Sequence, residues 1–413
     1  MRAMLGRVLT HAKKPLLQHP KLRESLKYLY DSVFGRIRKM EAYVITGLVK
    51  DSTGNMTMLY VGTRSSAHQF ASLIYAQISE FLPASSILLH EINVFSVISA
   101  PEIVAVRVPR PLIREFLKQG YLLLPNVNFI LDMRVSTDDI MKRMSRRRRR
   151  DIKKVNTLNY SYAICRDSDK DFDFFYNKMY LPYARSRFGK AAYVKPYLES
   201  KTVYRSNGGI IFVKKNEKPL AGMLFNIHGK TLHAWNFGAH EGDQRFVEEL
   251  AGEAALLFLI EWAKTQGIES LDYGVSLPFL REGIFTFKKE WGMSVNEQRD
   301  NPICALKVNA LNECSLSFLH MNPFIAIDGK TLKGVVFIDY KATNADLQQI
   351  YSRYFLPNLD SLIIISYYKP NSETTEKAES SATEKPKDGL MTPLQNICLT
   401  LQKKGFSIEV FEH

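Results

Sequence analysis

The sequence predicts a mixed α/β (α+β) protein of several domains, and three observations support this fold class. The chain has 413 residues, of which 46% are hydrophobic and 24% charged, so it is long enough to bury two or three cores. Segments with strand-like and helix-like spacing alternate along it. With 22 Gly, 17 Pro and 4 Cys, the composition excludes a collagen-like chain and a disulfide scaffold.

The first predicted element is a basic amphipathic helix within residues 1–40, a basic N-terminal extension. Apolar residues recur there every three or four positions from Leu22 to Met40, with Lys and Arg among them. Such a helix either packs on the body of the protein or lies on an anionic membrane or on RNA.

A first α/β unit is expected over residues 41–135. It has two strands joined by a Thr-Gly-Asn turn, a helix closed by Pro83 and a short helix closed by Gly120. The predicted strands are 43–49, 56–61, 86–89, 103–108 and 127–133, and the predicted helices are 65–81 and 111–119. Residues 136–160 follow as a basic linker helix that starts at the Ser136 cap.

A second unit is expected over residues 161–310, and a small C-terminal α/β module over residues 311–413. The second unit, like the first, has strands followed by a helix: the predicted strands are 209–214, 220–227, 231–237, 270–273 and 304–307, and the predicted helices are 171–183 and 243–266. The module alternates strands 334–340, 362–368 and 406–411 with helices 347–356 and 394–403. Residues 370–389 contain no Leu, Ile, Val or aromatic residue, which predicts a disordered loop.

The net charge of +14 is concentrated in two segments. Residues 1–39 carry ten basic and two acidic side chains, and residues 142–154 carry nine basic side chains against one Asp. The remaining residues sum to about neutral, which excludes a generally basic fold. The run Arg146–Arg150 has no aromatic residue near it, so it favours non-specific contact with phosphate or lipid over sequence-specific recognition of RNA. The alternative is a plain linker helix.

The cysteine pattern and the hydropathy bear on location. The four cysteines are scattered, with no spacing typical of a zinc site, and they suit a reducing compartment. No apolar run is long enough for a transmembrane helix, and the basic start lacks the apolar core of a signal peptide. We therefore expect a cytoplasmic protein without a bound metal.

Residues 140–310 contain a series of short motifs in a fixed order. After the basic helix these are Ala221-Gly222, Trp235 to Gly238, Ala263 to Gly267, Asp272 to Gly274, Phe287-Lys288 and Trp291-Gly292. In this order they resemble the FemAB-like branch of the GNAT acyltransferase superfamily. The resemblance implies tandem GNAT-like units, 41–135 and 161–310, and an N-acyltransferase. The implied donor is acyl-coenzyme A or aminoacyl-tRNA, and the implied acceptor is an amine on a small molecule or a peptide.

Several residues of the second unit are candidates for this chemistry. Asp272 either positions the amine or caps the following turn, and Tyr273 is a candidate proton donor. Lys288 either binds an anionic donor or substrate or is a surface lysine. His233 and Trp235 face one side of a strand, where they line a pocket or pack in the core. Arg245 is a candidate ligand for donor phosphates.

Three functions therefore remain open. The first is N-acyl transfer from acyl-coenzyme A. The second is aminoacyl transfer, with the basic segments holding tRNA. The third is an inactive GNAT-like module that binds nucleic acid or the surface of an anionic membrane through residues 1–39 and 142–154. The phosphate-binding motif of ordinary GNAT enzymes is missing, and Glu241 and Asp243 would repel a pyrophosphate in the corresponding loop.

Overall fold

The computed structural model describes residues 39–92, 100–188, 194–298, 302–369 and 391–413. The predicted loop 370–389 lies outside these ranges, as does the predicted N-terminal helix except for its end, where Lys39 and Met40 begin a strand. The described residues form three sheets with helices around them, which confirms the predicted mixed α/β class. No helix among these residues combines the length and the apolar character that crossing a membrane requires.

The chain divides into two compact units. Unit 1 comprises Met1–Asn126, Gln298–Phe355 and Asp360–His413, and unit 2 comprises Val127–Glu297 and Leu356–Leu359. Two strands therefore lie on the other side of the boundaries that we expected from the sequence. Strand β6 (Val127–Asp132) pairs with strands of unit 2, and β13 (Ile303–Val308) pairs with strands of unit 1.

Unit 1 contains a six-stranded sheet in the order β3-β1-β2-β4-β13-β5. Apart from β13, its strands are β1 (Lys39–Val49), β2 (Asn55–Val61), β3 (Tyr75–Leu88), β4 (Ile103–Val108) and β5 (Leu122–Leu124). The accompanying short helices are α4 (Arg64–Ile74), η2 (Leu89–Glu91), η3 (Arg110–Leu112) and α6 (Ile113–Lys118).

The predicted helix 65–81 is wrong in its second half, because α4 ends at Ile74 and β3 begins at Tyr75. Among the described residues, strand β3 lies at the edge of the sheet and pairs with β1 alone. Pro83 does not close a helix but lies within this strand, opposite Tyr43. An edge strand tolerates proline because it needs backbone N–H donors on one side only.

Unit 1 also contains a four-stranded sheet in the order β14-β15-β16-β17. Its strands are β14 (Phe324–Asp328), β15 (Thr331–Ile338), β16 (Ser361–Tyr368) and β17 (Ser407–Glu412), and the helices beside them are α15 (Glu313–Met321), α16 (Asn344–Tyr354) and α17 (Met391–Lys403). The elements from β15 onward follow the predicted β-α-β-α-β order. Helix α15 and strand β14 precede them and were not predicted.

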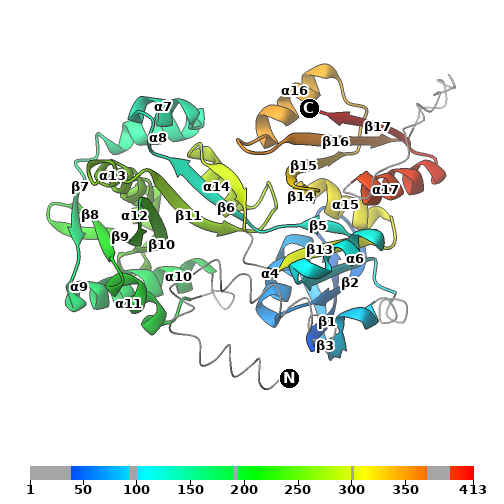
Figure 1. Ribbon diagram of the computed structural model, residues 1–413, viewed down its shortest axis with the longest axis horizontal. Coiled ribbons are helices and arrows are strands. Elements are labelled where there is room, and N and C mark those ends of the chain that lie inside the picture. The colour runs from blue at the N-terminus through cyan, green and yellow to red at the C-terminus, as the bar shows by residue number, and fades with distance from the viewer. Residues whose placement is uncertain (1–38, 93–99, 189–193, 299–301, 370–390) are drawn as a thin grey trace. The chain divides into compact units, whose positions relative to one another are not determined.

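Unit 2 is built on a seven-stranded sheet in the order β12-β6-β11-β10-β9-β8-β7 (Figure 1). Its remaining strands are β7 (Ser161–Cys165), β8 (Gly208–Lys215), β9 (Lys218–His228), β10 (Thr231–Ala239), β11 (Ser270–Ser276) and β12 (Ser294–Glu297). Its helices are α7 (Thr137–Arg143), α8 (Arg146–Val155), α9 (Asp169–Phe174), the π-helical η4 (Phe175–Tyr180), α10 (Leu181–Phe188), α11 (Tyr197–Arg205), η6 (His240–Gly242), α12 (Gln244–Glu248), α13 (Ala251–Thr265) and α14 (Gly283–Glu290).

Two long helices expected from the sequence are each broken in two. The linker helix is interrupted after Arg143, and Ser145 caps the new start by accepting a hydrogen bond from the Arg148 N–H. The helix expected over 243–266 is interrupted at Leu250, whose backbone is left-handed with φ of 67°. A serine N-cap starts a new helix and a residue in the left-handed region interrupts one, although the apolar spacing continues through both positions.

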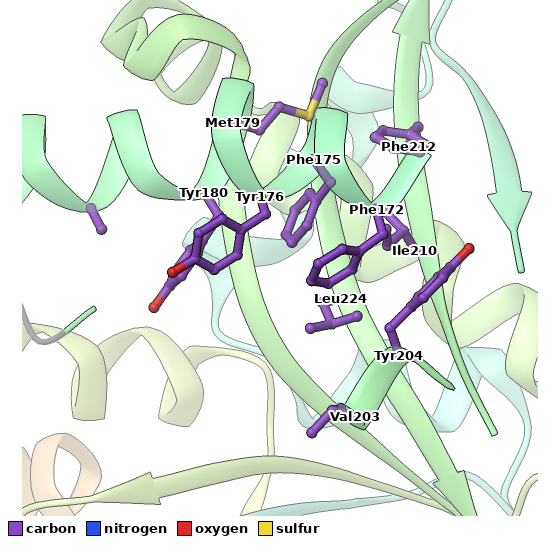
Figure 2. Packing of buried hydrophobic residues seen from close by; sticks show 11 residues of the cluster. Phe172, Phe175, Tyr176, Met179, Tyr180, Val203, Tyr204, Ile210, Phe212 and Leu224 are labelled. Atoms are coloured by element: carbon purple, nitrogen blue, oxygen red, sulfur yellow. The ribbon is translucent and has the colours of Figure 1, made fainter. Parts of the chain in front are cut away.

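The two faces of the unit 2 sheet are covered by different helices. Leu224 of β9 packs with aromatic rings of α9, η4 and α11 (Figure 2). The next residue, Phe225, packs against Trp262 of α13 on the opposite face. Figure 2 shows Phe172, Phe175 and Tyr176 lying against the strands that carry Ile210 and Leu224. This cluster fixes the helices over one end of the sheet.

Candidate active site

Strands β10 and β11 run parallel but pair over only three positions. The paired residues are 231–233 of β10 and 270–272 of β11, so His233 and Asp272 form the last pair. Beyond it β10 continues along β9, and β11 continues along β6 after a register shift. Separating parallel strands expose side chains and backbone groups at their carboxyl ends, which is where α/β sheets commonly bind ligands.

His233 and Asp272 are in direct contact at this point. Nδ1 of His233 lies 3.3 Å from Oδ2 of Asp272, and the His233 side chain is 32% exposed. In a neutral imidazole, an Nδ1 that faces a carboxylate as its N–H leaves the lone pair on Nε2. Nε2 has no partner among the described residues. The pair therefore has an open position toward solvent.

Asp272 is held by two further donors. Its Oδ1 accepts a hydrogen bond of 2.8 Å from the backbone N–H of Gly274, and its Oδ2 lies 3.4 Å from Nδ2 of Asn128 on β6. Gly274 has φ of +77°, a left-handed conformation that glycine adopts at little cost and that brings its N–H back toward the carboxylate. The capping role expected as an alternative for Asp272 is thus present together with the contact to His233.

A polar network continues from His233 along the same face. Trp235 donates from Nε1 to Oδ1 of Asn226 at 3.0 Å, and Asn226 donates from Nδ2 to Nε2 of His228 at 2.8 Å. The rings of His228 and His233 are 5.4 Å apart. Trp235 also packs against the aromatic cluster of Figure 2, so it supports the network from its buried end.

Tyr273 and Lys288 lie on the other face of β11. The ring of Tyr273 lies 5.9 Å from that of Phe287 in a tilted contact, and burial raises the pKa of the Tyr273 hydroxyl. Lys288 is 3% exposed and donates from Nζ to the carbonyls of Gly274 at 2.9 Å and Val275 at 3.1 Å. Burial lowers the pKa of Lys288 to about 8, against the opposing effect of Asp272 and Glu282. The structure places this lysine under β11, where it holds the backbone that follows Asp272.

Arg148 is buried beside Tyr273. It is 2% exposed, and its guanidinium lies 2.5 Å from Glu253 and 3.0 Å from Glu290. The same group lies over the rings of Phe287 and Trp291. Arg148 therefore joins α8 to α13 and α14 and is no part of an exposed basic surface. Arg149 is also engaged, since it donates to the carbonyls of Lys142 and Met144. Arg146, Arg147 and Arg150 remain exposed.

Arg245 lies apart from these residues on α12. Its side chain is 80% exposed and forms an ion pair with Asp243 at 2.6 Å. This contact lowers the pKa of the Asp243 carboxyl. Asp243 already neutralises the positive charge of Arg245, and Glu241 is close by in sequence. An incoming phosphate would therefore gain little attraction from Arg245.

Sequence reasoning missed three residues of the site, Asn128, Asn226 and His228. Asn128 and Asn226 are polar residues within apolar strands, at positions that face the candidate site. A buried polar residue in such a run needs a partner, and that signal could have identified Asn226, which is 3% exposed.

The described residues contain no group of three or more His, Cys, Asp or Glu side chains arranged to hold a metal ion. All four cysteines lie within them, and each is a free thiol.

Comparison with known proteins gives structural likeness only. No family model matches the sequence, and no curated protein matches it. The chain is similar to FemX, with 10% identity, a TM-score of 0.35, and coverage of 65% of this chain and 84% of that one. It is similar to L-PGS from Bacillus licheniformis, with 12% identity, a TM-score of 0.33, and coverage of 67% and 87%.

A third similar structure is the C-terminal domain of a putative lysylphosphatidylglycerol synthetase from Agrobacterium fabrum. It has 10% identity and a TM-score of 0.31, with 71% of this chain and 95% of that chain covered. The expected resemblance to FemAB-like proteins thus has a counterpart among solved structures. Because the TM-scores are below 0.5, these likenesses carry no argument about activity.

Proposed function

We propose that unit 2 transfers an acyl group to an amine, with His233 as the general base and Asp272 as the residue that orients it. The observation that carries this proposal is the contact of 3.3 Å between Nδ1 of His233 and Oδ2 of Asp272 where β10 and β11 separate. A carboxylate that holds one imidazole nitrogen leaves the other available to accept a proton.

The proposed reaction has one proton to move. The amine nitrogen attacks the acyl carbon and forms the new C–N bond, while Nε2 of His233 takes the proton that the nitrogen loses. The bond between the acyl carbon and its leaving group then breaks, and the leaving group takes up a proton. The imidazolium of His233 is the proposed donor of that proton, because the Tyr273 side chain lies beside Phe287 on the other face of β11.

Lys288 is proposed to support this site indirectly. Its ammonium group holds the carbonyls of Gly274 and Val275, and the N–H of Gly274 holds Asp272. The same turn therefore links Lys288 on one face of β11 to the carboxylate on the other. This contact fixes the backbone, and we assign Lys288 no direct contact with a donor or substrate.

Acyl-coenzyme A is the first donor to test, and aminoacyl-tRNA is the second. The segment between β10 and α13 contains Glu241, Asp243, Glu248 and Glu249, and its Arg245 is paired with Asp243. A pyrophosphate bound there would face several carboxylates. The exposed basic residues of α8 favour the second donor, because they supply positive charge outside this segment.

The experiment uses the full chain in two arms. In the first, acetyl- or longer acyl-coenzyme A is mixed with a panel of amines, and release of free thiol and the mass of the product are measured. In the second, tRNA that carries a labelled amino acid replaces coenzyme A. We expect His233→Gln to lower the rate of transfer by about 100- to 10,000-fold, the usual contribution of a general base, with the unfolding midpoint unchanged. Asp272→Asn should also slow transfer.

His240→Gln is the matched control, because His240 lies in the same unit and contacts only Phe174 among the aromatic rings of the described residues. It should transfer at the wild-type rate. Equal rates for wild type and His233→Gln would exclude His233 as the base. Absence of transfer in both arms, with folded protein and a broad amine panel, would contradict the transferase proposal itself.

A further inference from the structure

We infer that the exposed face of α8 binds the phosphate backbone of a double-helical nucleic acid. The residues concerned are Arg146, Arg150, Lys153 and Lys154, which we call the basic stripe. Each is exposed, and none has an ion-pair partner among the described residues. The inference concerns binding and does not require the transfer activity proposed above.

Helical spacing places these side chains together. Arg146, Arg150 and Lys153 are separated by four and three residues, and Lys154 is four residues after Arg150, so all four lie on one side of the helix. At about 1.5 Å per residue, the stripe spans roughly 12 Å along the helix axis. A row of cations of this length can contact several consecutive phosphates of one nucleic-acid strand.

The opposite side of α8 is fully occupied. Arg148, Ile152 and Val155 are each 2–3% exposed. Asp151 turns inward, toward Arg148 at 3.7 Å, so its carboxylate does not neutralise the stripe. The helix is therefore fixed in rotation with its cations outward. Arg147 flanks the stripe and is 69% exposed, with ion-pair distances near 4 Å to Asp151 and Glu290.

This arrangement favours nucleic acid over a membrane. A helix that lies in a membrane interface inserts an apolar face beside its basic residues. The apolar residues of α8 are buried in unit 2, and those left exposed on the helix are charged. Pure electrostatic attraction is enough for a phosphate backbone, whereas stable attachment to a membrane usually needs an apolar contribution as well.

The same residues favour a duplex over a single strand. Proteins that bind single-stranded nucleic acid stack bases on aromatic side chains. Residues 137–155, which include α7 and α8, contain no aromatic residue. A surface with cations and no stacking group contacts phosphates only, so binding should depend on salt and not on base sequence.

The experiment measures binding of the full chain to a fluorescent RNA duplex of about 20 base pairs by anisotropy, from about 50 to 200 mM salt. A DNA duplex, a single-stranded RNA and vesicles of phosphatidylglycerol and phosphatidylcholine serve as comparison probes. The test variant is R146Q/R150Q/K153Q. The control is K170Q/K178Q/K218Q, which removes the same charge from exposed lysines of unit 2 outside the stripe.

We expect the stripe variant to reduce the slope of log Kd against log salt by about two to three and to weaken duplex binding about tenfold or more, with the control near wild type. Thermal unfolding of both variants should match wild type, because the substituted side chains are exposed. Equal duplex binding by the two variants would overturn the inference. So would loss of vesicle binding, and not of duplex binding, in the stripe variant alone. An effect on duplex binding without any transferase activity would separate this surface from the proposed reaction.

Discussion

Asp272 and Tyr273 are neighbours on β11, but they belong to two clusters of different character. On the face of Asp272, His233 is about one-third exposed and keeps an unpaired nitrogen. On the face of Tyr273, the buried Arg148 forms ion pairs of 2.5 and 3.0 Å with the partly buried Glu253 and Glu290. The cluster of Asp272 has a position open to a ligand, whereas the charged groups in the cluster of Tyr273 pair with one another.

This difference distinguishes side chains that take part in the proposed reaction from side chains that stabilise the fold. A buried ion pair that loses one partner leaves an unpaired charge, so its removal should appear first as lost stability. A half-exposed pair with a free position contributes little to folding, so its removal should appear as lost activity. Substitutions on the two faces of β11 can test whether the molecule follows this division.

The largest effect on stability is expected for Arg148→Met. Methionine preserves much of the side-chain volume but leaves Glu253 and Glu290, which are 13% and 17% exposed, without their cation. Removing one partner of such a buried pair costs about 3–5 kcal/mol of unfolding free energy. Urea denaturation followed by tryptophan fluorescence reports on the right region, because all three tryptophans, at positions 235, 262 and 291, lie in unit 2.

Arg147→Met is the control for this experiment, since Arg147 is the next residue on α8 and is 69% exposed. Its loose ion pairs should contribute about 1 kcal/mol or less. If the two variants were equally stable, the buried cluster would not have the structural role assigned to it, and the contrast between the two faces of β11 would fail.

The second prediction concerns Lys288 and pH. Burial lowers the pKa of its ammonium group to about 8, below the ordinary value of 10.5. Between these two values the unfolded chain binds more protons than the folded chain, so stability rises as pH increases through this window. Over the whole window the gain is about 3 kcal/mol, and below pH 8 the full penalty for the buried charge is present.

The measurement compares wild type with Lys288→Met by urea denaturation from pH 7 to pH 10. Groups other than Lys288 titrate alike in both proteins, so the difference between the two curves isolates this lysine. Wild type should gain stability relative to the variant as the pH rises above 8. Parallel curves would mean that Lys288 titrates as an exposed lysine does, in conflict with its burial.

The elements that the sequence predicted well are those whose apolar pattern has one interpretation. Strands β8, β9 and β10 follow one another with clear turns and were predicted nearly to their ends. Residues 75–81 were misassigned because Ile78 and Phe81 are spaced three apart, as on a helix, although Ile78 is 37% exposed in the edge strand β3. Pairing with β1, a tertiary contact, decides that segment.

The candidate site was predictable only in part. Asp272 and His233 were each identified, but their contact depends on the parallel register of two strands that are 39 residues apart in sequence, which local patterns do not contain. Arg148 was placed in a basic patch with its four neighbours. Its spacing of four and seven residues from the buried Ile152 and Val155 indicates an inward position, and that signal could have separated it from the run.

The smallest effect on stability is expected for Tyr273→Phe. This substitution also gives the sharpest comparison between the two faces of β11. The Tyr273 hydroxyl has no hydrogen-bond partner among the described residues, so its removal should change the unfolding free energy by about 0.5 kcal/mol or less. If the hydroxyl donates a proton or a hydrogen bond during transfer, kcat/KM should fall about tenfold, which corresponds to about 1.4 kcal/mol.

Tyr204→Phe gives the opposite expectation and serves as the control. The Tyr204 hydroxyl bonds to the backbone N–H and carbonyl of Ser168 at 2.9 and 3.2 Å, so its loss should lower stability by about 1–2 kcal/mol and leave the rate of transfer unchanged. If Tyr273→Phe changed neither quantity, Tyr273 would belong with Arg148 as a supporting residue. The reacting groups would then lie on the Asp272 face alone, because its neighbour on β11 would have no part in the chemistry.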